Sequence, residues 1–118
     1  MNLLKETIKA LELDGKTQKD VRWVGSKDGK YAIGWEEFEK IAKDVEYYCG
    51  YGAPEIAEDL VVVGDGWWLE RAEYDGSEWW EFKTIPKIKE GLPFKLVKKT
   101  EKVGWYSIEN INQKGGKK

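Results

Sequence analysis

Residues 67–84 have the sequence WWLERAEYDGSEWWEFKT. Aspartate followed by glycine at positions 75 and 76 supplies the positive φ angles of a two-residue type I′ turn. The eight residues on each side are rich in aromatic side chains, which favour strands. The segment therefore predicts a β-hairpin with Tyr74 opposite Ser77, and the register of all other cross-strand pairs follows from this pair.

This register assigns the hairpin side chains to two faces. The face expected to join a core carries Trp67, Leu69, Arg71, Trp80 and Phe82. The other face mixes aromatic and charged side chains, and tryptophan and tyrosine are enriched at binding surfaces because they give large contact area at low rotamer cost. We therefore predict a partner-binding surface formed by Trp68, Glu70, Tyr74, Trp79, Glu81 and Lys83.

The same register places glutamates opposite one another, Glu70 with Glu81 and Glu73 with Glu78. Like charges in direct cross-strand pairs destabilise a hairpin. Either the acidity serves binding, or basic side chains such as Lys83 and Arg71 and those of a neighbouring strand neutralise it. The sequence favours both interpretations equally.

Hydrophobic periodicity predicts the remaining elements. Helices are expected over residues 3–13 and 35–42, and further strands over residues 21–25, 30–33, 60–63 and 94–97. The run LVVV at 60–63 is the most hydrophobic strand and is expected to be central, as is the hairpin. The predicted fold class is α+β, an antiparallel sheet of five or six strands with two helices packed on one face. We predict one domain over residues 1–112 and a disordered lysine and glycine tail over 113–118.

Composition argues against an enzyme. The chain contains no histidine and one cysteine, Cys49. Imidazole performs most acid–base chemistry near neutral pH and much metal binding. Neither a phosphate-binding glycine motif nor a calcium loop is present. We predict a binding protein without metal or cofactor, and expect it in the cytoplasm because no signal peptide or membrane span is evident.

Charge is segregated along the sequence. Residues 34–82 contain fourteen acidic and three basic residues, a net charge of −11, whereas residues 83–118 contain three acidic residues and ten lysines, a net charge of +7. An acidic surface can imitate nucleic-acid phosphates and occupy a basic cleft, such as that of a defence nuclease. The lysine-rich segment suits either contact with nucleic acid or a solubilising role.

Three stretches of the chain resemble small uncharacterised accessory proteins of Firmicutes phages and prophages. They are GYGAPEIAEDLVVVGDGWWLERAEYDGSEWWEFKTIPK at 50–87, MNLLKETIKALELDGKTQKDVRWVGSKDGKYAIGWEEFEKIA at 1–42, and WYSIEN at 105–110. The group has no settled activity, so the resemblance assigns no functional residue. It implies a small phage protein that acts by binding and disabling a host system in the bacterial cytoplasm.

Three functional hypotheses follow. The first is a stoichiometric inhibitor of a host defence or regulatory factor, with an anti-CRISPR-type inhibitor as its most concrete form. The second is a sponge for a small nucleotide signal, in which Arg71, Tyr51 and Trp105 stack on or hold the ligand. The third is a homodimeric interaction protein without ligand, whose exposed tryptophans form the dimer interface.

Overall fold

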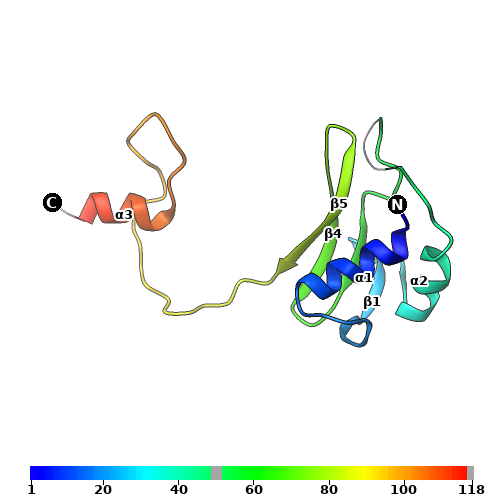
Figure 1. The fold of residues 1–118 in the computed structure, drawn as a ribbon. Coiled ribbons are helices and arrows are strands. Elements are labelled where there is room, and N and C mark those ends of the chain that lie inside the picture. The colour runs from blue at the N-terminus through cyan, green and yellow to red at the C-terminus, as the bar shows by residue number, and fades with distance from the viewer. Residues whose placement is uncertain (49–51, 117–118) are drawn as a thin grey trace. The chain divides into compact units, whose positions relative to one another are not determined.

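A computed structural model of the chain describes the backbone of residues 1–48 and 52–116 and the side chains of residues 1–48 and 52–113. The chain divides into two compact units, an N-terminal unit, Met1–Pro86, and a C-terminal unit, Lys87–Lys118 (Figure 1). A single domain over residues 1–112 stays a prediction. Cys49 and Tyr51 lie outside the described residues.

The N-terminal unit contains one antiparallel sheet of five strands in the order β2-β1-β3-β4-β5. The strands are β1 Trp23–Ser26, β2 Ala32–Ile33, β3 Leu60–Val63, β4 Trp67–Tyr74 and β5 Ser77–Thr84. Two α-helices accompany the sheet, α1 Leu3–Leu13 and α2 Trp35–Ala42, with a short 3₁₀ helix, Gln18–Asp20, between α1 and β1. The predicted α+β class is confirmed.

β3 is the central strand, as predicted, because it pairs with β1 on one side and β4 on the other. The prediction of a central hairpin is wrong, because β4 and β5 form one end of the sheet and β5 is the outermost strand. The period-two pattern and the Asp75–Gly76 turn predict a hairpin, but they do not determine its place in the sheet. The aromatic side chains of β5 do not require a central position. They instead reflect a helix packed over one face of β5, since β5 contacts α1.

The hairpin has the predicted register. All eight predicted pairs form, from Trp67 with Thr84 to Tyr74 with Ser77. Asp75 has φ 51° and Gly76 has φ 87°, as a type I′ turn requires at both central positions. The register of this hairpin could therefore be predicted from the local sequence alone.

Both helices cover the same face of the sheet. Val24, Val62, Leu69 and Phe82 are successive cross-strand neighbours on β1, β3, β4 and β5, so they share one face. The apolar sides of α1 and α2 pack there to give a core of Leu3, Leu11, Val24, Trp35, Phe38, Ala42, Val62, Trp67, Leu69 and Trp80. Trp80 joins this core from β5, and its Nε1 donates a hydrogen bond of 2.9 Å to Thr7 Oγ1 on α1. We call the opposite face, which neither helix covers, the open face.

The described side chains of the C-terminal unit, residues 87–113, form little core. Its helix α3 spans Ile108–Gly116, so it includes most of the predicted tail, and Ile111 is buried. The strand predicted over residues 94–97 is wrong, because this segment is irregular. The backbone of this segment bonds to a side chain instead of to a strand. Asn112 Oδ1 accepts hydrogen bonds from the Lys95 and Leu96 amides, each at 3.0 Å. Among the described residues no helix is long and apolar enough to cross a membrane.

Candidate functional site

The open face carries aromatic side chains on β1, β4 and β5. Trp23, Val63, Trp68 and Lys83 are successive cross-strand neighbours in one row from β1 to β5. Trp23 and Trp68 are half-buried in this row. The row extends the hairpin surface across the sheet, and Trp23 is a member that the sequence prediction did not include.

Two Trp-x-Glu triplets organise the hairpin part of this face. Trp68 Nε1 donates to Glu70 Oε1 at 2.7 Å on β4, and Trp79 Nε1 donates to Glu81 Oε2 at 3.3 Å on β5. Because the strands are antiparallel and Glu70 pairs with Glu81, the two carboxylates lie between the two indoles. Each indole is thereby held in one orientation by a charge-assisted hydrogen bond before any partner arrives.

Lysines neutralise this pair of glutamates. Lys27 Nζ lies 3.5 Å from Glu70 Oε1, and Lys83 Nζ lies 3.5 Å from Glu81 Oε1. The Trp68 indole and then the Lys27 charge hold the pKa of Glu70 below its ordinary value, against the raising effect of burial. Of the two interpretations of the opposed glutamates, neutralisation by basic side chains accounts for Glu70 and Glu81.

Replacing Trp68 with phenylalanine is expected to raise the pKa of Glu70 toward the ordinary glutamate value of about 4.3, because the indole donor is lost. A carboxylate whose pKa is lowered by folding stabilises the protein above its unfolded-state pKa. That stability is lost as pH falls through the folded-state pKa. The free energy of unfolding of the Trp68→Phe variant should therefore fall less on acidification than that of wild type. A carbon-13 NMR titration of the Glu70 carboxylate measures its pKa in wild type and in Trp68→Phe. Trp79→Phe is the control, and an unchanged pKa in Trp68→Phe would assign the effect to Lys27 instead.

All six residues predicted for partner binding lie on the open face. Tyr74 is 76% exposed and Trp79 is 38% exposed at the turn end of the hairpin. Trp68, Glu70 and Glu81 are half-buried, and Lys83 is exposed. The exposed aromatic surface is therefore concentrated near the Asp75–Gly76 turn.

The residues proposed to stack on a nucleotide have other environments. Arg71 lies on the helix-covered face, and its side chain is only 4% exposed. Trp105, in the C-terminal unit, is fully exposed. Tyr51 lies outside the described residues. Because Arg71 is already bonded to carboxylates, its guanidinium is not available to a phosphate.

Arg71 is the centre of a buried polar cluster that also includes Glu6, Tyr47 and Glu78. Its guanidinium donates to Glu78 Oε1 at 2.8 Å, to Tyr47 Oη at 3.1 Å and to Glu6 Oε2 at 3.3 Å. It also lies over the Trp80 ring, with Cζ 4.7 Å from the ring centroid. Burial alone would lower the pKa of Arg71, but the bonds to Tyr47 and Glu78 and the charge of Glu6 raise it. The cation is therefore permanent.

Glu78 extends this cluster to the loop before β3. Glu78 Oε2 accepts from the Glu55 amide at 2.7 Å and Oε1 from the Ile56 amide at 3.4 Å, and Glu78 is only 5% exposed. Glu78 was not assigned to a face from the sequence. Because it lies two residues before Trp80 on the same strand, the alternation of side chains was the signal that could have indicated its burial. No pattern in the sequence indicated that Glu6 and Tyr47 would join this cluster.

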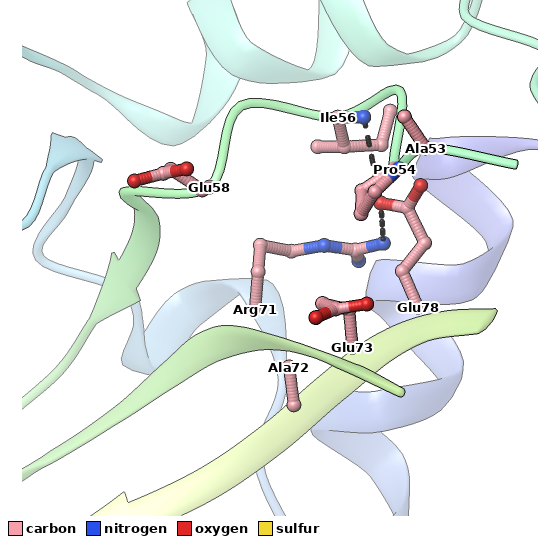
Figure 2. Close-up of a pocket in the computed structure, with 8 residues that line it drawn as sticks. All are labelled: Ala53, Pro54, Ile56, Glu58, Arg71, Ala72, Glu73 and Glu78. Carbon is pink, nitrogen blue, oxygen red and sulfur yellow. Dashed lines mark hydrogen bonds and ion pairs between the residues drawn. The ribbon is translucent and has the colours of Figure 1, made fainter. Parts of the chain in front are cut away.

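A pocket of about 430 Å³ lies beside this cluster, between the loop 53–58 and the turn end of the hairpin. Figure 2 shows Arg71 running across the pocket toward Glu78, beneath the loop that carries Ile56. The lining residues are Ala53, Pro54, Ile56, Glu58, Arg71, Ala72, Glu73 and Glu78. Ala72 is the cross-strand neighbour of Trp79, so the pocket adjoins the exposed end of the open face.

Comparison of the chain with protein-family models, curated proteins and solved structures found no match. Functional inference therefore depends on the open face, the buried cluster and the pocket.

Proposed function

We propose that this chain is a binding protein that docks a partner protein on the open face of its sheet and acts by stoichiometric occupation rather than catalysis. The observation that carries this proposal is the ordered aromatic surface around Trp68, Tyr74 and Trp79. The indoles of Trp68 and Trp79 are fixed by carboxylates, and Tyr74 is the most exposed of the three aromatic residues. Aromatic anchors held in place before binding lose little conformational entropy on association.

The charge of the N-terminal unit indicates the chemistry of the partner. Residues 1–86 contain eleven basic and nineteen acidic residues, a net charge of −8, whereas residues 87–118 contain nine lysines and three acidic residues, a net charge of +6. A partner that presents a basic surface is attracted to the first unit and oriented by it. In the phage setting that the sequence resemblance implies, this partner is a host defence or regulatory factor, and an inhibitor of a nucleic-acid-binding nuclease is the most specific form.

Partner capture tests the proposal. The tagged protein is incubated with lysate from phage-infected Firmicutes cells, and the retained proteins and extracted small molecules are identified by mass spectrometry. We expect one protein in near-stoichiometric amount. Trp79→Ala should weaken the purified complex by about 2 kcal/mol, as expected for a central aromatic anchor. Glu70→Gln/Glu81→Gln should weaken it too, because both indoles lose their charged acceptors.

Leu13→Ala is the matched control, since Leu13 is an exposed apolar residue on α1, outside the open face. It should leave capture unchanged. Equal capture by wild type and Trp79→Ala would contradict the proposal. Recovery of a nucleotide without a protein would favour the sponge hypothesis, and a concentration-dependent doubling of mass in light scattering, lost in Trp79→Ala, would favour the homodimer.

A further inference from the structure

The pocket beside Arg71 contains negative charge that the described residues do not neutralise. Glu58 and Glu73 line it and form no hydrogen bond or ion pair with any described residue. Arg71, the cation that lines the pocket, is shared between Glu78 and Glu6. The described side chains form no group of three metal-binding residues, so an organic cation fits this set better than a metal ion.

Arg71 provides a second observation that points to a ligand. Its side chain is almost fully buried, yet its Nε atom has no hydrogen-bond partner among the described residues. A buried N–H group without an acceptor costs about 1–3 kcal/mol. A ligand that brings an acceptor to Arg71 Nε would give this N–H group a partner, and a cationic group on the same ligand would pair with the exposed carboxylates of Glu58 and Glu73.

The backbone of β4 is free at the same place. β3 pairs with β4 only at Trp68, Leu69 and Glu70, so residues 71–74 of β4 have no strand beside them on the β3 side within the described chain. Ala72 and Glu73 of this free edge line the pocket. An extended polypeptide can add to such an edge through main-chain hydrogen bonds while its alternate side chains enter pockets.

We propose that the pocket binds a lysine or arginine residue of the partner protein, presented on an extended segment along the free edge of β4. The cationic group meets Glu58 and Glu73, and the aliphatic stem lies against Ala53, Pro54 and Ile56. Long basic side chains commonly bury their stems in this way while their charged ends reach polar groups. The proposal rests on the proposed function, since it describes a feature of the same partner.

The pocket is tested without the partner by using N-acetyl-lysine N-methylamide as the probe. Its addition to nitrogen-15-labelled protein should produce saturable shifts in the amide signals of Ala53, Ile56, Ala72 and Glu73. N-acetyl-norleucine N-methylamide has the same stem without the ammonium group and should bind at least tenfold more weakly. Glu58→Gln/Glu73→Gln should weaken the lysine probe by at least tenfold.

Glu36→Gln/Glu37→Gln is the matched control, because it makes the same change in net charge at two exposed residues of α2. It should leave the affinity for the probe within twofold of wild type. The proposal is overturned if the probe gives no saturable shifts, if the norleucine analogue binds equally well, or if both double variants behave alike. Because the probe binds without any partner protein, these results do not depend on capture through the open face.

Discussion

Replacing Trp80 with alanine is expected to lower the free energy of unfolding by about 3–5 kcal/mol, the range for truncating a large aromatic residue in a core. Trp80 is 9% exposed and belongs to the core cluster. The truncation also removes the 2.9 Å hydrogen bond to Thr7 Oγ1 and the ring beneath the Arg71 guanidinium. Urea denaturation followed by circular dichroism measures the loss.

Trp79→Ala is the matched control on the neighbouring position of the same strand. Trp79 points to the open face and is 38% exposed, so its truncation should cost less than half as much. Equal losses for the two variants would show that the open face is also covered. That result would contradict the binding surface proposed for this face. The proposal requires a much larger loss for Trp80→Ala than for Trp79→Ala.

Replacing Arg71 with methionine is expected to destabilise the fold by about 3–5 kcal/mol, the cost of removing one partner from a buried ion pair. Methionine keeps much of the stem but leaves the Glu78 carboxylate without its cation in a buried position. Glu6 and Tyr47 lose their shared donor as well. Urea denaturation of the variant at pH 7 measures this effect.

Arg22→Met is the control for removing a cation from an ion pair. Arg22 pairs with Asp65, but both side chains are largely exposed, so the loss should stay below about 1 kcal/mol. Arg71→Met/Glu78→Gln should recover about 1 kcal/mol or more relative to Arg71→Met, because the uncompensated charge is removed. No recovery in the double variant would show that Arg71 acts through packing on Trp80 rather than through its charge.

The sequence by itself determined the elements whose cause is local. Asp75–Gly76 requires a type I′ turn, and this turn sets the whole register of β4 and β5 because side chains alternate along a strand. The same alternation correctly separated the buried Trp67 and Trp80 from the exposed Trp79. Helices α1 and α2 also have the predicted bounds, since an amphipathic pattern is local information.

Tertiary structure decided everything that depends on which segments become neighbours. One example is the outer position of β5 in the sheet. Others are contacts between residues that are distant in sequence: Lys27 with Glu70, and Arg71 with Glu6 and Tyr47. The opposed glutamates show this most clearly. Sequence alone identified the repulsion between them and named Lys83 and Arg71 as side chains that could relieve it. Which cation reaches which carboxylate was decided by packing: Lys27 contacts Glu70, Lys83 contacts Glu81, and Arg71 contacts Glu78. The physical reason is that a charge is stabilised by the groups that folding brings within a few ångströms of it.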